Sequence, residues 1–255
     1  TFNEGVEAFE KGDYKTALQI FEALSATNNS KAQYNLGIMY GNGYGVKQDY
    51  LKAKEWFEKA AVQGHSEAQN EIGFIYRNGY GVKQDYLKAR EWFEKAAVQG
   101  HSEAQNHLGT MYDNGHGVKQ DYKKAVEWFV KAANQGNANA QFNLGVLYAK
   151  GLGVKQDYKK AKEWFEKAAA QGYLGAQYNL GLMYSNGKGV KQDYKKAKEW
   201  FEKAAAQGYL DAQFNLGVMY ENGYGVKQDK RVAKKWFGEA CDGGDQGGCD
   251  NYKKL

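Results

Sequence analysis

The chain has 255 residues, no proline and a formal net charge of +5, from 35 Lys and Arg against 30 Asp and Glu. Both signs are interleaved along the chain, which argues against the basic patch of a nucleic-acid-binding protein. No stretch approaches the ~18 consecutive apolar residues that a membrane helix needs, so we predict no membrane insertion.

Residues 1–31 predict one helix pair. Gly12 and Asp13 are expected to form the turn and the N-cap of the second helix. Small and apolar residues recur at helical spacing on both sides of this turn, at Gly5, Ala17, Ile20, Phe21 and Leu24. The chain begins at Thr1 without a Met, inside what looks like a helix, so we expect that residues upstream were removed. They could be a signal peptide, or the sequence could simply start at an arbitrary boundary.

From Ala32 onward the sequence repeats every 36 residues, and an Ala-Gln pair recurs at Ala68, Ala104, Ala140, Ala176 and Ala212. Units of this size bury their apolar faces against their neighbours in an array. Because no linker interrupts the period, we predict a single solenoid domain over residues 1–255. It comprises a first helix pair at 1–31, six repeats at 32–247 and the start of a capping helix at 248–255.

The first part of each repeat predicts a helix, helix A, at about residues 31–41 of the first repeat. Ala32, Leu36 and Tyr40 fall four residues apart and predict the face that packs on a partner helix. Gly37 recurs in every repeat although a glycine inside a helix costs about 1 kcal/mol relative to Ala. We therefore expect the backbone of the partner helix to come close at this glycine.

A loop and a second helix, helix B, follow. Gly43 and Gly45 suit a turn with positive φ, and Asp49 predicts the N-cap of helix B at about residues 50–63. Gly64 is expected to end helix B. The apolar face of helix B is predicted at Ala53, Trp56, Phe57, Ala60 and Ala61.

The C-terminal segment predicts a short final helix A. Gly248-Cys249-Asp250-Asn251 aligns with Ala212-Gln213-Phe214-Asn215 of the last full repeat. Lys253 replaces the packing glycine, which suits a helix whose outer face meets solvent at the end of the array.

These motifs resemble the Sel1-like repeat, a relative of the tetratricopeptide repeat. The residues that carry the resemblance are Leu36-Gly37-x-x-Tyr40, Gly43-x-Gly45-Val46, Asp49, Lys52-Ala53, Trp56-Phe57 and Lys59-Ala60-Ala61. The resemblance covers six units, and residues 1–31 resemble a plain tetratricopeptide unit because they lack the four-residue turn insertion. It implies an all-α, right-handed superhelical α-solenoid of antiparallel helix pairs, with the A helices lining a concave side.

A second stripe on helix A varies between repeats, at residues 34, 38 and 41 of the first repeat and their equivalents. We call it the variable stripe. The family resemblance makes it the concave groove, with candidate partner-binding residues Tyr34, Ile38, Asn70, Phe74, Arg77, Asn106, Thr110, Asp113, Phe142, Tyr178 and Phe214. Aromatic zones flanking a polar middle suit an extended peptide or a helix, with backbone groups held by the Asn amides. The alternative is that the aromatic rings only fill space between neighbouring A helices.

The chain has two cysteines. Cys241 falls at the end of the last helix B and Cys249 at the start of the final helix A. Cysteine-rich secreted relatives bridge two helices at a similar spacing, so the resemblance implies a Cys241–Cys249 disulfide. A disulfide would indicate an oxidising compartment, periplasmic or extracellular for a secreted protein, whereas reduced thiols in the cytoplasm are the alternative.

No catalytic, metal or cofactor site is predicted. His65, His101, His107 and His116 lack metal-binding spacing and are expected at the surface. No serine lies in a G-x-S-x-G elbow, and the glycine loops do not follow a strand as a nucleotide-binding fingerprint requires.

We therefore predict a non-enzymatic scaffold, an exported bacterial monomer that holds a protein or peptide, and not nucleic acid, in its groove. The resemblance leaves two alternatives. One is a toxin-neutralising, immunity-type partner. The other is a β-lactamase-like enzyme, as proposed for cysteine-rich relatives, which would need a nucleophile with a positioned base that the sequence does not offer.

Overall fold

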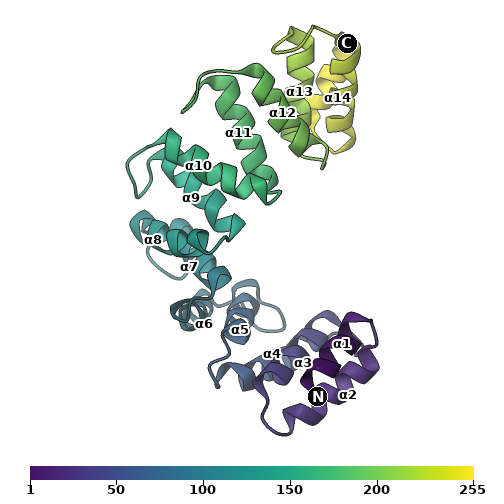
Figure 1. Cartoon of the computed structure of the whole chain (residues 1–255), viewed down its shortest axis with the longest axis vertical. Coiled ribbons are helices and arrows are strands. Elements are labelled where there is room, and N and C mark those ends of the chain that lie inside the picture. Colours follow the sequence, from purple (N-terminus) through teal and green to yellow (C-terminus); the bar gives the residue numbers. More distant parts are fainter. The chain divides into compact units, whose positions relative to one another are not determined.

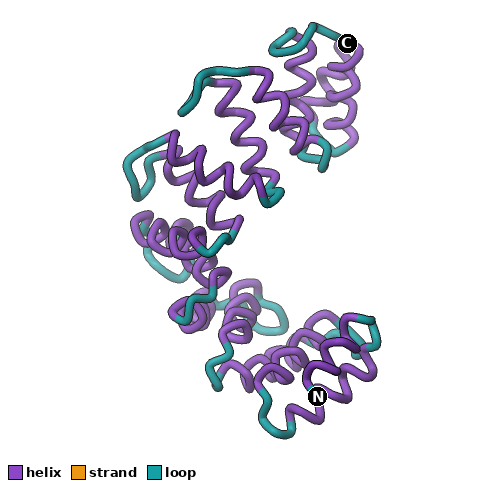
Figure 2. Tube along the Cα trace, viewed as in Figure 1, coloured by secondary structure: helices purple, strands orange, loops and turns teal.

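A computed structural model describes all 255 residues as fifteen α-helices with connecting loops and turns. Helices and loops are the only elements in Figure 2, which confirms the all-α fold class. The helices form two compact units, Thr1–Ala132 and Ala133–Leu255. That residues 1–255 act as one continuous solenoid domain stays a prediction. No helix is both long and apolar enough to cross a membrane.

The N-terminal unit consists of successive helix pairs. Each A helix packs along the B helix that follows it, and each B helix packs against the next A helix (Figure 1). The helices are α1 (Phe2–Glu10), α2 (Tyr14–Ser25), α3 (Ser30–Asn42), α4 (Tyr50–Ala61), α5 (Ser66–Asn78), α6 (Tyr86–Val98), α7 (Ser102–Asn114) and most of α8 (Tyr122–Asn134).

The C-terminal unit has the same arrangement, with pairs α9–α10, α11–α12 and α13–α14 followed by a single last helix. Its helices are α9 (Ala138–Lys150), α10 (Tyr158–Ala170), α11 (Leu174–Asn186), α12 (Tyr194–Ala205), α13 (Leu210–Asn222), α14 (Lys230–Asp242) and α15 (Gln246–Lys254).

The recurring glycine of helix A is explained by an aromatic ring on helix B. A Cβ atom at Gly73 would lie 2.6 Å from the Phe93 ring of α6, and Phe93 is fully buried. The same glycine–phenylalanine contact recurs in the C-terminal unit at Gly181 and Phe201. Close packing at this glycine is confirmed, but a ring, and not the backbone of the partner helix, occupies the space.

The buried face of helix A differs by one residue from the predicted face. Ala32 and Leu36 are fully buried as predicted, but the third buried residue is Met39, whereas Tyr40 is only half-buried. At 3.6 residues per turn, Tyr40 is rotated about 80° around the helix from Ala32, while Met39 is rotated only about 20°. The four-residue spacing therefore predicted a residue that lies beside the buried face, and Met39 is buried in the place predicted for Tyr40.

The loop between helices A and B fixes the geometry of each repeat. Gly43 ends α3 with φ at 74°, and the Asp49 carboxylate caps α4 by accepting from the Lys52 amide at 3.1 Å. Gln48 spans the loop by donating to the Gly41 carbonyl at 2.8 Å. Both predicted helix boundaries are confirmed.

Within each unit the same loop also contacts the preceding helix pair. The Tyr44 ring stacks on Tyr14 with centroids 5.0 Å apart, and Tyr80 stacks on Tyr50 at 5.1 Å. The four-residue insertion that distinguishes these repeats from residues 1–31 thus supplies contacts between repeats.

Buried glutamines join each helix B to the next helix A. Gln69, 6% exposed, donates to the Ala61 carbonyl at 3.1 Å and accepts from Gln99 at 2.8 Å. Gln105 repeats the bond to the Ala97 carbonyl at 3.1 Å. These bonds give a second donor to carbonyl groups at the end of helix B, since the Ala61 carbonyl also accepts from the Gly64 amide at 2.9 Å.

The first helix pair and the short final helix were both predicted and are present in the structure. Asp13 caps α2 by accepting from the Thr16 amide at 3.2 Å. At the C-terminus, Cys241 of α14 and Cys249 of α15 lie at disulfide distance, with Cα atoms 4.5 Å apart. The inner repeats have an Ala and a Gln at these two positions, joined by a hydrogen bond such as Gln213 to the Ala205 carbonyl at 3.2 Å. The cysteine pair thus stands where the inner repeats have that hydrogen bond.

Candidate functional site

The variable stripe of the N-terminal unit runs along α3, α5 and α7. The Tyr34 ring is half-buried, with its centroid 5.7 Å from Phe57 and 4.9 Å from His65. The Arg77 guanidinium lies 5.0 Å from the centre of the Phe74 ring. These stripe residues contact the next helix and the next repeat while keeping part of their surface accessible.

The polar middle of the stripe is largely inside the fold. Asn70 and Asn106 are only 2% and 7% exposed. Thr110 donates its hydroxyl to the Asn106 carbonyl at 3.1 Å, and Thr110 and Asp113 are half-buried. That the Asn amides hold the backbone of a partner stays a prediction.

The aromatic residues of the stripe in the C-terminal unit pack on their own B helices. Phe142 lies 5.8 Å from Phe165 and Tyr178 lies 5.7 Å from Phe201, measured between ring centroids. Phe214 makes the corresponding contact with a B-helix phenylalanine in the last full repeat. Packing explains one side of each ring, and all three stripe residues remain partly exposed.

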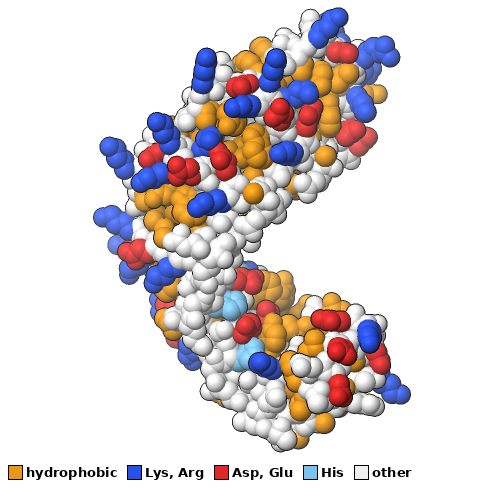
Figure 3. Space-filling model, viewed as in Figure 1, with side chains coloured by type: hydrophobic (Ala, Val, Ile, Leu, Met, Phe, Trp, Pro, Cys, Tyr) orange, Lys and Arg blue, Asp and Glu red, His pale blue; other side chains and the backbone are white.

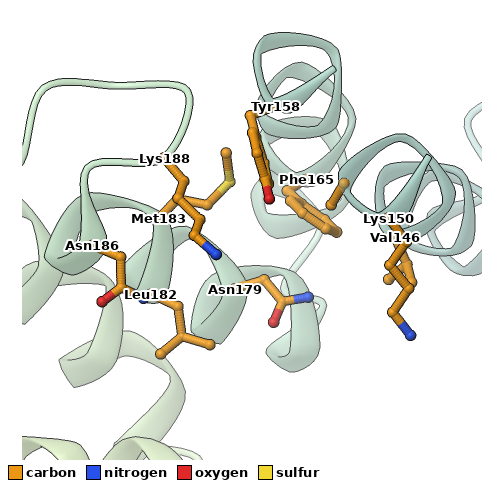
Figure 4. Close-up of a pocket in the computed structure, with 10 residues that line it drawn as sticks. Val146, Lys150, Tyr158, Phe165, Asn179, Leu182, Met183, Asn186 and Lys188 are labelled. Atoms are coloured by element: carbon orange, nitrogen blue, oxygen red, sulfur yellow. The ribbon is translucent and has the colours of Figure 1, made fainter. Parts of the chain in front are cut away.

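A pocket of about 390 Å³ opens between α9, α10 and α11 in the C-terminal unit. Its lining includes two stripe residues, Val146 and Leu182, at the position equivalent to Ile38. In Figure 4, Tyr158 and Phe165 project from α10 towards Asn179 of α11. The pocket therefore combines an apolar wall with an amide.

Two lysines complete this pocket. Figure 4 shows Lys188 beside Met183 on one side and Lys150 beside Val146 on the other. The Lys188 ammonium lies 5.6 Å from the centre of the Tyr158 ring. No carboxylate is among the lining residues, so the pocket is positively charged.

The N-terminal unit has a pocket at the equivalent place, three repeats earlier, between α3, α4 and α5. It measures about 150 Å³. Ile38 and Phe74 take the places of Val146 and Leu182, while Glu71 and Tyr80 take the places of Asn179 and Lys188. Residues of the variable stripe therefore line pockets in both units, and the charge of the pocket differs between them.

Ionisable side chains gather beside the smaller pocket. The Arg77 guanidinium donates to Nδ1 of His107 at 2.9 Å, and Nε2 of His107 lies 3.7 Å from the Glu103 carboxylate. Burial lowers the pKa of His107, so its ring is neutral at pH 7 and can accept from Arg77. Figure 3 shows histidine surface next to carboxylates in the lower part of the view.

Glu71 is the unusual member of this group. Burial raises the pKa of Glu71 to about 7, and the Glu103 carboxylate adds to the increase. Burial also raises the pKa of Tyr34 to about 12, with Glu71 as the largest charge contribution. Glu71 is therefore poised to ionise near neutral pH in a site that disfavours its charge.

The expectation that all four histidines lie at the surface is wrong for His107 and His65. The His107 side chain is 11% exposed, with its ring centroid 4.7 Å from Phe93, and the His65 side chain is 13% exposed. His65 and His101 cap α5 and α7 through Nδ1, which accepts from the amide of the third residue onward. His116 is exposed as expected and stacks on Tyr86.

Sequence reasoning missed Glu71, Glu103 and His107. A signal for two of them is in the repeat, because Glu71 and His107 occupy a position that is asparagine in the other four repeats, at Asn35, Asn143, Asn179 and Asn215. The variable stripe runs along the position one residue earlier, at Tyr34 and its equivalents, and does not include this one.

No three His, Cys, Asp or Glu side chains lie close enough together to hold a metal ion. The histidine that is best placed for chemistry, His107, faces Arg77 and Glu103, and no serine, threonine or cysteine is hydrogen-bonded to it. The arrangement therefore offers shaped pockets and charge, without a paired nucleophile and base.

The chain was compared with known proteins. The family model described as Sel1 repeat matches residues 30–65, 66–101, 102–137, 138–173, 175–209 and 210–245. A search of curated protein sequences returned no match.

Three solved structures illustrate the similarity. A protective antigen of uropathogenic Escherichia coli strains is 38% identical with a TM-score of 0.89, over 93% of this chain and 51% of that chain. The chain thus spans about half the length of that antigen. A Sel1 repeat protein of Oxalobacter formigenes is 36% identical with a TM-score of 0.87, over 95% of this chain and 99% of that one. An immunity protein of Pseudomonas aeruginosa, 24% identical with a TM-score of 0.55 over 86% of this chain and 82% of that one, shares the fold alone.

The six matched segments correspond to the six predicted repeats, each beginning about two residues before the predicted start. The loop, glycine and capping contacts described above recur with the same period as these matches. The chain therefore belongs to the Sel1 repeat family.

Proposed function

We propose that this chain is a non-enzymatic scaffold that binds a protein or peptide along the variable stripe of its A helices. The observation that carries the proposal is the recurrence of a pocket at equivalent positions in both units, lined by stripe residues and by the helix B behind them. A Sel1 repeat array generally serves protein interaction. A pocket on the face of the A helices suits a side chain of a bound peptide or helix.

Differences between the two pockets favour recognition of a specific partner over non-specific binding. One pocket contains Glu71, whereas the other contains Lys150 and Lys188. Pockets of different charge would each select partner side chains of complementary charge and disfavour others.

We further propose that the chain works as a monomer in an oxidising compartment, periplasmic or extracellular. The Cys241–Cys249 pair at disulfide distance supports such a compartment. Alkylation of the protein from its native source, with and without prior reduction, tests this. Labelling of both cysteines without reductant would overturn the assignment.

Capture of partners from the native extract tests the scaffold proposal. The bait variant is Phe74→Thr with Leu182→Thr, because Thr110 already occupies this position in another repeat and the fold accepts it. The control variant is Leu51→Lys with Leu87→Lys, exposed positions of helix B where Lys123 and Lys159 stand in other repeats. A partner retained by the wild type and by the control but lost by the bait variant supports the proposal.

Equal capture by the bait variant would remove the variable stripe as the binding surface. A single tight partner with nuclease, protease or other toxic activity would identify the scaffold as an immunity-type protein. Hydrolysis of a chromogenic β-lactam that persists in the bait variant would instead support an enzyme.

A further inference from the structure

The pocket between α3, α4 and α5 has the size of a single side chain. Its volume of about 150 Å³ is below the ≈ 300 Å³ at which small-molecule sites begin. The glycines of α3, Gly37 and Gly41, leave the space open on the α3 side.

Aromatic rings line much of this pocket. Tyr50 and Tyr80 stack at a centroid distance of 5.1 Å, and Phe74 lies 5.7 Å from Tyr80. All three rings line the pocket together with Phe57. Aromatic faces attract cations through their quadrupole, most strongly in a site that excludes water.

Glu71 is the only charged residue lining the pocket. No hydrogen bond or ion pair within the chain engages its carboxylate. The nearby cation on α5, Arg77, is instead directed to His107 and stacked on Phe74. A partly buried carboxylate without a partner is costly, and a cation supplied from outside would relieve that cost.

We propose that this pocket receives a lysine or arginine side chain of the protein or peptide partner. The aliphatic part of that side chain packs on Ile38 and Ile75, and its charged end lies among the tyrosine rings and pairs with Glu71. The inference rests on the proposed scaffold function and adds the chemistry of one anchor.

The equivalent pocket of the C-terminal unit shows that the cation preference comes from particular residues and not from the repeat architecture. There Asn179 replaces Glu71 and Lys188 replaces Tyr80. That pocket keeps the apolar wall but would repel a cation, so it serves as an internal control.

The pocket is tested by NMR titration of the full chain with n-butylammonium, which mimics a lysine side chain, and with propylguanidinium, which mimics arginine. Neutral n-butanol is the matched control ligand. The chain has four isoleucines, and Ile38 and Ile75 line the pocket, so labelled isoleucine methyl groups report on it directly. Methionine methyl labelling of Met183 reports on the control pocket.

We expect saturable chemical-shift changes of the Ile38 and Ile75 methyl groups with at least one of the two cations. The affinity for n-butanol should be lower than the affinity for that cation by about tenfold or more. Glu71→Asn should weaken cation binding by about tenfold or more, because a hydrogen-bonded charge pair is lost. Asn stands at this position in four repeats, so the variant preserves the fold. Glu67→Asn removes the same charge from the exposed start of α5 and should bind as the wild type does.

Equal binding of n-butanol by the wild type, or unchanged cation binding by Glu71→Asn, would overturn the inference. The comparison of n-butanol with the cations uses only the wild type, so it still tests the inference if Glu71→Asn misfolds. The titration needs no protein partner, so its failure would remove the cationic anchor and leave the scaffold proposal to be decided by partner capture.

Discussion

Replacing Glu71 by Asn should stabilise the folded chain by an amount that depends on pH. Burial raises the pKa of Glu71 from its ordinary value of 4.5 to about 7. Between these values the unfolded chain has lost the proton while the folded chain still holds it. The folded state therefore binds more protons in this window, and stability falls as the pH rises through it.

The magnitude follows from the pKa difference. A tenfold change in a proton equilibrium is worth about 1.4 kcal/mol, so a pKa of about 7 in place of 4.5 gives an upper limit of about 3 kcal/mol above pH 7. Because Glu71 is only partly buried, solvent screening reduces this to about 1–2 kcal/mol. Below the ordinary pKa the carboxyl is protonated in both states and the pH-linked cost vanishes.

Urea unfolding of the wild type and of Glu71→Asn at about pH 4.5 and about pH 8 measures this effect. The variant should gain about 1–2 kcal/mol relative to the wild type between the two pH values. Glu67→Asn is the control, since it removes a carboxylate that is more exposed on the same helix. A difference between wild type and Glu71→Asn that is the same at both pH values, or that shrinks at the higher pH, would refute the reasoning.

Three further predictions concern the packing of the repeats. Gly73→Ala should lower the free energy of unfolding in urea by about 1–3 kcal/mol, because its Cβ atom would meet the Phe93 ring. Gly41→Ala should not destabilise the chain, because its Cβ atom would lie 3.6 Å from the Ala53 Cβ atom, an ordinary contact distance. Gln69→Ala should cost about 1–3 kcal/mol in the same assay, because it removes two part-buried or buried hydrogen bonds, one to the Ala61 carbonyl and one from Gln99, and an unchanged midpoint would contradict this. Reducing the cysteine pair should lower the free energy of unfolding around α14 and α15 by about 2–3 kcal/mol, seen as faster amide hydrogen exchange there; unchanged exchange would show that the pair adds no stability.

The helix pairs, their caps and their loops could be predicted because each depends on residues close together in the sequence. Asp49 and Gly43 act within one turn of their own positions, so their roles are visible in a single repeat. The period then extends the same local structure along the chain.

Contacts between repeats were harder to predict. The stacking of Tyr44 on Tyr14 joins residues 30 positions apart, and it depends on how one helix pair rests on the previous one. The sequence of the loop does not indicate which ring of the preceding helix pair Tyr44 meets. The misplacement of Tyr40 has a related cause, since the exact rotation of helix A is set by packing against helix B.

The candidate site was predicted only in part. The variable stripe identified Phe74 and Ile38, which line a pocket. It did not identify Glu71, because that residue belongs to a position that is asparagine in most repeats and its place in the pocket depends on α3 and α4 of the preceding repeat.

The central claim is that the face of the A helices bearing the variable stripe is the surface that meets the partner. Photo-crosslinking from p-benzoylphenylalanine tests it most directly, with the probe placed at Phe74 or Leu182 on this face and, in separate samples, at Leu51 or Leu87 on the outer face of helix B. The account predicts a crosslink to the same protein from Phe74 and Leu182 and none from Leu51 or Leu87. Crosslinks from the helix B positions alone would contradict it.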